Sequence, residues 1–187
     1  MKDKQGITLI ELLITIGLIG IILIVITSVY LTGYRTFQEE LSSSMVQSNA
    51  QTILDALTID IKNGMLIEQT YDIYTTGPSS IIIRVPTTNS SKQIQYSGTN
   101  MLYDRIVYYY QNNEIHKIVF ADPTSARYSS SGKDNILDSK ILTLGFEYDP
   151  DQMTATLVKA TISSDIKVGN RNKSITISGE ARLRNHI

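Results

Sequence analysis

The sequence of 187 residues contains no cysteine and no tryptophan. Without cysteine the chain can form no disulfide, so its folded part must depend on the burial of apolar side chains. The same absence excludes thiol catalysis and thiolate metal sites. The formal net charge of −1 gives no bulk attraction to nucleic acid or to an anionic membrane surface.

Catalytic and cofactor-binding signatures are missing as well. No G-x-S-x-G, Walker loop or H-E-x-x-H motif occurs in the chain. His116 and His186 stand far apart, and each is expected to be an exposed or packed side chain rather than a metal ligand. Asp149-Pro150-Asp151 lacks the spaced ligands of an EF-hand loop and predicts a turn. The sequence therefore predicts no enzyme activity, no bound metal and no cofactor.

One long apolar run near the start dominates what the chain does contain. Between Ile7 and Tyr30 the only charged residue is Glu11, and apolar residues cover every face of a helix built on this stretch. At about 1.5 Å per residue these ~24 residues make a helix of roughly 36 Å, which is enough to cross a bilayer. A short polar leader, residues 1–6, precedes this run. Lys2 and Lys4 leave the leader net positive, so it is expected to stay in the cytoplasm.

The position of Glu11 calls for an explanation, because a carboxylate inside a membrane helix costs free energy. The run is longer than the ~7–15 residues of a secretory signal, and no small-x-small cleavage site follows it. If the chain is cut after Gly6, the new α-amine of Ile7 lies one helical turn from Glu11 on the same face. In a bundle of such helices, Glu11 would meet the amine of a neighbouring subunit and fix their register. The alternative is a simple signal anchor with an incidental glutamate.

The segment Lys-Gln-Gly-Ile-Thr-Leu-Ile-Glu-Leu-Leu at 4–13 closely resembles a known motif. It is similar to the cleavage and methylation motif of type IV prepilins and of the pseudopilins of type II secretion and competence systems. The resemblance implies that a membrane prepilin peptidase cuts between Gly6 and Ile7 and N-methylates Ile7, and that Glu11 is the assembly glutamate. Ile7 replaces the more common Phe, which the family tolerates. The membrane helix lacks the proline of many major pilins, which favours a minor pilin or pseudopilin.

Helical spacing of apolar residues continues beyond Tyr30 to about Lys62, where Asn63-Gly64 predicts the end, with Gly64 in a left-handed cap. The expected role of this apolar stripe is packing against a core. Its members are Leu31, Tyr34, Phe37, Leu41, Met45, Ile53, Leu57 and Ile61.

After Gly64 the apolar residues recur with period two, which predicts strands. A hairpin is expected around Asn112-Asn113, and the segment 121–134 is expected to be a surface loop. The other expected strands cover 81–85, 140–148, 154–163 and 173–184. The predicted fold is α+β and type IV pilin-like, with a long N-terminal helix packed on a C-terminal antiparallel sheet.

This pattern divides the chain into four parts. The expected parts are a cleaved leader (1–6), a transmembrane and assembly half of the helix (7–30), an amphipathic half (31–63) and a β-rich globular head (64–187). No internal repeat or long linker indicates a second domain.

The C-terminal end is locally basic, with Lys167, Arg171, Lys173, Arg182 and Arg184. These residues are candidates for DNA binding, which would be useful to a competence pilus. The alternative is a solvated strand edge that charge protects from pairing with other chains.

A second candidate binding surface is an adhesive aromatic one, formed by Tyr103, Tyr108, Tyr109, Tyr110 and Tyr128. Alternation along a strand sends Tyr108 and Tyr110 to one face and Tyr109 to the other. Part of this aromatic set is therefore expected in the core rather than on an adhesive surface.

Taken with the resemblance, the sequence predicts a structural minor pilin that enters a type IV pilus or pilus-like filament after cleavage and N-methylation. The expected partners are other pilins or pseudopilins, the prepilin peptidase, the inner-membrane assembly platform and the membrane, with DNA or a surface ligand as a further candidate. The expected location is the cytoplasmic membrane, with an extracytoplasmic C-terminal domain, and then an extracellular filament. Three alternatives stay open: a minor pseudopilin of a type II secretion or competence DNA-uptake system, a tip adhesin, and a signal-anchored binding module or enzyme that never polymerises.

Overall fold

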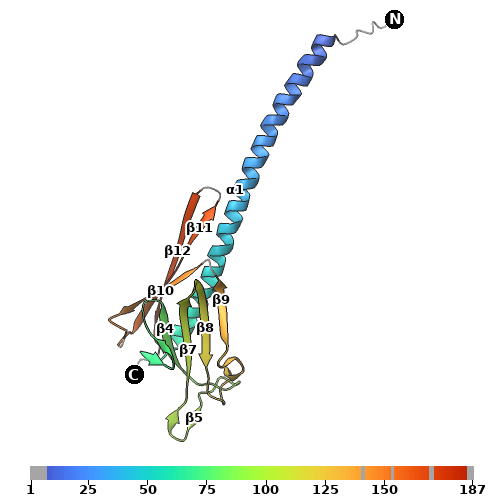
Figure 1. Cartoon of the computed structure of the whole chain (residues 1–187). Coiled ribbons are helices and arrows are strands. Elements are labelled where there is room, and N and C mark those ends of the chain that lie inside the picture. The colour runs from blue at the N-terminus through green and yellow to red at the C-terminus, as the bar shows by residue number, and fades with distance from the viewer. Residues whose placement is uncertain (1–7, 140–141, 153, 169–170, 185–187) are drawn as a thin grey trace. The chain divides into compact units, whose positions relative to one another are not determined.

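A computed structural model describes residues 8–139, 142–152, 154–168 and 171–184. Within these residues the chain forms one α-helix, α1 (Leu9–Asn63), which is followed by β-strands and one short 3-10 helix, η1 (Tyr128–Ser130) (Figure 1). The chain divides into two compact units, Met1–Ser43 and Ser44–Ile187. The first unit holds the N-terminal part of α1, and the second holds the rest of the helix and the described strands.

The described strands of the second unit form two larger antiparallel sheets and two small hairpins. One sheet has the order β1-β4-β7-β8-β9 and the other the order β10-β11-β12, while β2-β3 and β5-β6 pair separately. The bounds are β1 (Leu66–Ile67), β2 (Thr70–Tyr71), β3 (Tyr74–Thr75), β4 (Ser80–Pro86), β5 (Tyr96–Ser97), β6 (Asn100–Met101), β7 (Tyr103–Gln111), β8 (Glu114–Phe120), β9 (Asp134–Ser139), β10 (Thr143–Asp149), β11 (Leu157–Val168) and β12 (Arg171–Arg182).

The predicted hairpin between β7 and β8 is confirmed. Gln111 pairs with Glu114, and both turn residues, Asn112 and Asn113, have positive φ values of 54° and 63°. Asparagine tolerates this left-handed backbone, and such a two-residue turn matches the twist of the flanking strands. The two asparagines therefore set the register between β7 and β8, two of the inner strands of the larger sheet.

Two of the longer strands, β9 and β11, differ from the sequence prediction. Residues 134–139, which the sequence places at the end of a loop and beyond it, form the edge strand β9, paired with β8 through a register shift at Ile115/His116. An edge strand has few buried neighbours and can therefore be polar. Because β9 is polar, its sequence lacks the alternation of apolar residues that predicts a strand. The strand β11 also continues past its predicted end at 163 to Val168, since β12 pairs with it without interruption.

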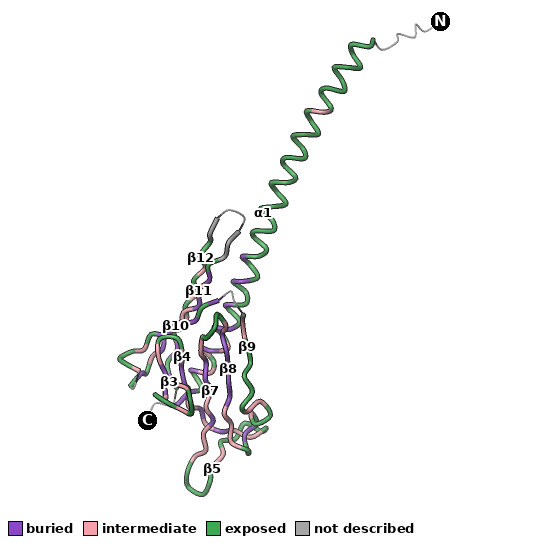
Figure 2. The backbone as a smooth tube through the Cα atoms, viewed as in Figure 1, coloured by how far each residue is buried: buried purple, intermediate pink, exposed green. Residues whose placement is uncertain are grey.

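The C-terminal part of α1 packs on both sheets, and the predicted α+β fold is confirmed. In Figure 2 the buried residues of the second unit gather along the helix and along the strands that face it. Ala50, Leu54, Leu57 and Ile61 are buried on the helix side. The main partners in the same core include Ile81, Ile83, Ile106 and Tyr108 of the five-stranded sheet, and Phe146, Val158, Ala160 and Ile162 of the three-stranded sheet.

The apolar stripe that the sequence predicts along the helix is buried only in its C-terminal part. Ile53, Leu57 and Ile61 are buried, but Leu31, Tyr34, Phe37, Leu41 and Met45 are each at least 40% exposed. Packing within this chain therefore accounts for the last turns of the stripe and leaves its first part uncovered.

The helix ends at Asn63 as predicted, but the expected left-handed cap at Gly64 is wrong. The described glycines with positive φ are Gly98 and Gly132, and Gly64 is not one of them. A Cβ at Gly64 would lie 2.7 Å from Ile83 and 2.8 Å from Leu183. Glycine is needed at this position because the chain leaves the helix directly against the core.

A polar cluster joins the helix to the five-stranded sheet. The fully buried Tyr108 donates its hydroxyl hydrogen to Asp60 Oδ2 at 2.6 Å, and Lys117 Nζ donates to the same oxygen at 2.7 Å. Burial, with the Asp60 carboxylate beside it, raises the pKa of the Tyr108 hydroxyl far above its usual value. Because α1, β7 and β8 each contribute one member, these bonds fix the rotation of the helix on the sheet.

Candidate functional site

Glu11 lies in the first turn of α1, where its side chain closes a capping box with Thr8. The backbone N–H and the hydroxyl of Thr8 both donate to Glu11 Oε2 at 2.9 Å. The backbone N–H of Glu11 donates in return to Thr8 Oγ1 at 3.3 Å. This is the reciprocal arrangement of a Ser/Thr-x-x-Glu sequence at a helix start. Sequence analysis missed this local role, although Thr-Leu-Ile-Glu is its signature.

The capping box has a geometric consequence for any intermolecular role of Glu11. Within the described residues its side-chain bonds use Oε2, so Oε1 is open to a second donor. The two bonds from Thr8 also hold the carboxylate in one orientation. Gly6 and Ile7 lie outside the described residues, so cleavage and methylation there stay predictions.

The helix that carries Glu11 can cross a membrane by length and composition. Among the described residues α1 is the one helix that meets this requirement, and its apolar window has a mean hydropathy of 3.0 with none of it buried. From Leu9 to Ile26 the large apolar side chains are all exposed by more than half. A helix that is apolar on every face needs lipid or other helices around it.

The five basic residues near the C-terminus do not come together. Lys173 pairs with Ile166 near one end of the β11–β12 hairpin, whereas Arg182 pairs with Leu157 at the other end. At about 3.4 Å per residue these two positions are about 30 Å apart along β12. Lys167 and Arg171 belong to the Lys173 end, and their side chains lie outside the described part. The exposed Arg184 follows Arg182, so the structure separates the candidate DNA-binding residues into two groups.

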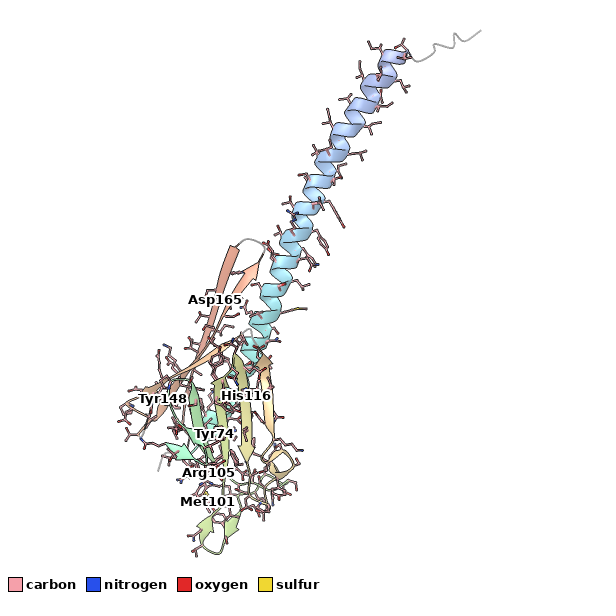
Figure 3. The ribbon with its side chains drawn as sticks, in the orientation of Figure 1. Tyr74, Met101, Arg105, His116, Tyr148 and Asp165 are labelled. Carbon is pink, nitrogen blue, oxygen red and sulfur yellow. The ribbon has the colours of Figure 1, made fainter. Side chains whose placement is uncertain are left out.

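His116 is a packed histidine, as predicted, and His186 lies outside the described residues. The Nδ1 atom of His116 lies 3.0 Å from Asp134 Oδ2, and the His116 ring stacks on Tyr109 with 4.6 Å between centroids. Figure 3 shows His116 on β8, within the sheet. Tyr109 also donates to Asp134 Oδ2, and burial together with this bond raises the pKa of its hydroxyl. The described residues contain no group of three or more His, Asp or Glu that could hold a metal ion.

A buried carboxylate that sequence analysis did not single out organises the loop after β8. Asp104 is completely buried and accepts hydrogen bonds from Thr87 Oγ1 at 2.8 Å and Ser125 Oγ at 2.6 Å. Arg127 Nη1 donates to it at 2.9 Å, and the backbone N–H of Asp122 at 3.0 Å. A buried charge is tolerated when it is paired and hydrogen-bonded in this way. Asp104 therefore ties the loop to the ends of β4 and β7.

Comparison with known families identifies the N-terminal segment. Residues 1–27 match the family model described as the prokaryotic N-terminal methylation motif. This match covers the leader, the capping box with Glu11 and most of the apolar run. Comparisons with curated proteins and with solved structures give no match.

Proposed function

We propose, on the premise of the prokaryotic N-terminal methylation motif at residues 1–27, that the chain is a minor pilin of the type IV prepilin and pseudopilin family, a structural subunit of a type IV pilus or pilus-like filament. The observation that carries this proposal is the single carboxylate, Glu11, at the start of an exposed apolar helix inside that motif. The lack of proline between 7 and 30 favours a minor subunit over a major one.

In this proposal the chain is first held in the membrane by α1 and is cut between Gly6 and Ile7. The N-methylated amine of Ile7 then stays cationic, and the carboxylate of Glu11 on a neighbouring subunit pairs with it. Thr8 occupies one oxygen of that carboxylate, which leaves Oε1 for the amine. Away from water this attraction is strong, and an unpaired charge is costly, so subunits out of register are disfavoured.

The exposed part of the helical stripe supplies the rest of the proposed contact. Tyr34, Phe37 and Leu41 are 54%, 59% and 40% exposed. Full burial of an exposed Leu or Phe side chain is worth about 1.5–3 kcal/mol, and covering these partly exposed side chains would contribute a part of that. In a filament the helices of adjacent subunits would cover these residues, as the sheets cover the C-terminal part of the stripe.

The proposal predicts that filament entry depends on the processing enzyme. In a host with a prepilin peptidase and an assembly ATPase, we expect the chain in the fraction of filaments sheared from cells. In the same host without the peptidase we expect it only in the membrane fraction, since the leader blocks the amine that Glu11 requires. Immunoblots of the two fractions measure this. Equal amounts in sheared filaments with and without the peptidase would contradict the proposal and favour a membrane-anchored binding module.

A further inference from the structure

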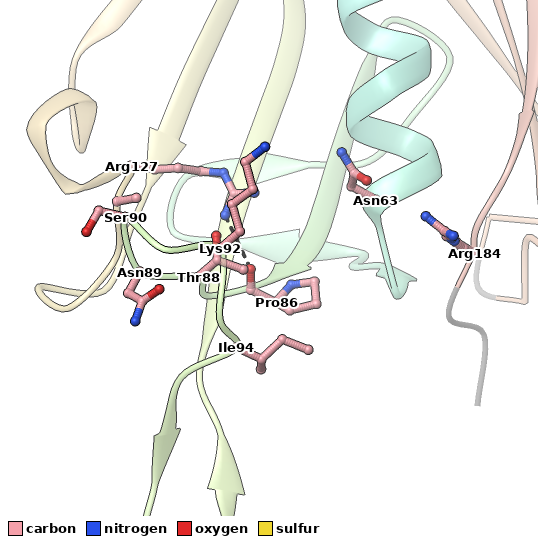
Figure 4. Close-up of a pocket in the computed structure, with 10 residues that line it drawn as sticks. Asn63, Pro86, Thr88, Asn89, Ser90, Lys92, Ile94, Arg127 and Arg184 are labelled. Carbon is pink, nitrogen blue, oxygen red and sulfur yellow. Dashed lines mark hydrogen bonds between the residues drawn. The ribbon is translucent and has the colours of Figure 1, made fainter.

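A groove of about 780 Å³ opens in the second unit beside the residue that ends α1 (Figure 4). Its lining comes from Asn63, from the segment that follows β4, from the loop held by Asp104, and from Arg184 beyond β12. All of these segments belong to the same compact unit. A cavity of this size matches binding sites for small molecules or for several units of a polymer, rather than for a single ion.

The lining of the groove is cationic. Lys92, Arg127 and Arg184 line the groove, and none of its lining residues is acidic. Among the described residues the ion pairs include Arg127 with Asp104, but neither Lys92 nor Arg184 takes part in one. The site stands out against a chain whose net charge is −1.

The fold fixes the side chain of Arg127 and the backbone at Lys92. Arg127 Nη1 donates to Pro86 O at 3.2 Å as well as to the buried Asp104. Lys92 has a φ of 61° in a tight turn, where Asn89 Oδ1 accepts the backbone N–H groups of Ser91 and Gln93. Figure 4 shows Lys92 and Arg127 on one side of the groove. Asp104 balances the charge of Arg127, whereas Lys92 has no acidic partner among the described residues, so its charge is open to an anion in the groove.

Arg184 faces Lys92 and Arg127 from the other side of the groove, next to Asn63 (Figure 4). The partial negative charge at the C-terminal end of α1 accounts for a cation at this place. It does not account for Lys92 or Arg127, which come from loops. Asp104 accounts for Arg127 on its buried side, so Lys92, which has no acidic partner among the described residues, is the main evidence for an anionic ligand.

We propose that this groove binds a phosphodiester chain. Lysine, arginine, serine, threonine and asparagine side chains are those that contact phosphate oxygens in proteins that bind nucleic acids. The groove offers this set, with Thr88, Asn89 and Ser90 beside the three cations. Cations on both of its sides suit a ligand with repeated charges. Among the sequence candidates for DNA binding, the inference keeps Arg184 and adds Lys92 and Arg127.

Binding of defined polymers to the full chain in detergent tests the inference. We expect labelled oligothymidylate or poly(glycerol phosphate) to bind at low salt, and polyglutamate, a carboxylate polymer, to bind at least tenfold more weakly. Lys92→Ala should weaken phosphodiester binding by about 3- to 10-fold and reduce the slope of log affinity against log salt by about 0.7–0.9. The matched control is Lys133→Ala, since Lys133 is an exposed loop lysine outside the groove.

Comparing the binding of the two phosphodiester polymers identifies the source of the ligand. Binding of oligothymidylate alone indicates nucleic acid, and binding of poly(glycerol phosphate) alone indicates a cell-surface polymer. No binding of either polymer, equal binding of polyglutamate, or an equal effect of Lys133→Ala would overturn the inference. Lys92→Ala should leave cleavage and filament entry unchanged, so this test can fail without affecting the proposed function.

Discussion

Glu11→Gln is expected to leave cleavage at Gly6 intact and to remove the chain from filaments. Glutamine keeps the length of the side chain and can still close the capping box with Thr8. It loses the negative charge that the methylated amine of a neighbour would require. Leaving a buried charge without its partner costs about 3–5 kcal/mol, which corresponds to a loss of incorporation of more than about 100-fold.

Thr8→Ala provides the matched comparison, because it removes the capping hydroxyl and keeps the charge. Loss of an N-cap typically costs about 1 kcal/mol, so we expect incorporation to fall by no more than about tenfold. Both variants are measured by the ratio of the chain in sheared filaments to the processed chain in membranes. If Glu11→Gln assembled as well as the natural chain while Thr8→Ala failed, Glu11 would act through helix capping and the charge-pairing account would be wrong.

The largest loss of stability is expected for Asp104→Asn. An amide in place of the carboxylate removes the charge that Arg127 pairs with and turns an NH₂ group toward donors such as Ser125 Oγ. At a fully buried site, unmatched donors and a broken ion pair are each costly. Arg127 is 31% exposed, so water relieves part of the loss. We expect the free energy of unfolding to fall by about 2–4 kcal/mol.

Urea unfolding of the full chain in detergent, followed by tyrosine fluorescence, measures this change. Asp165→Asn is the control, because Asp165 is an exposed residue of β11 and its replacement should change stability by less than about 0.5 kcal/mol. Equal unfolding midpoints for the two variants would show that the Asp104 cluster does not hold the loop after β8.

The sequence predicts those features that residues close together in the chain determine. The membrane-capable helix and the β7–β8 turn at Asn112 and Asn113 follow from neighbouring residues, and the structure confirms both. The capping box is equally local, but a contact between subunits also explains Glu11 and draws attention away from it. Its signature, Thr8 three residues before Glu11, was present in the sequence.

Features that depend on distant parts of the chain could not be predicted. Asp104 gathers groups from positions 87, 122, 125 and 127, which the sheet topology brings together and no periodic pattern records. Gly64 is required by contact with Ile83 and Leu183, both distant in sequence, rather than by its own backbone angle. The extent of the buried stripe depends in the same way on where the sheets meet the helix.

The mass of the mature N-terminal peptide tests the central claim most directly. In cells that contain a prepilin peptidase, the account predicts a chain that begins at Ile7 and carries one methyl group on its α-amine. The amine would then be free to pair with Glu11 of a neighbour. A chain that retains Met1, or one cut at a different bond, would contradict the account.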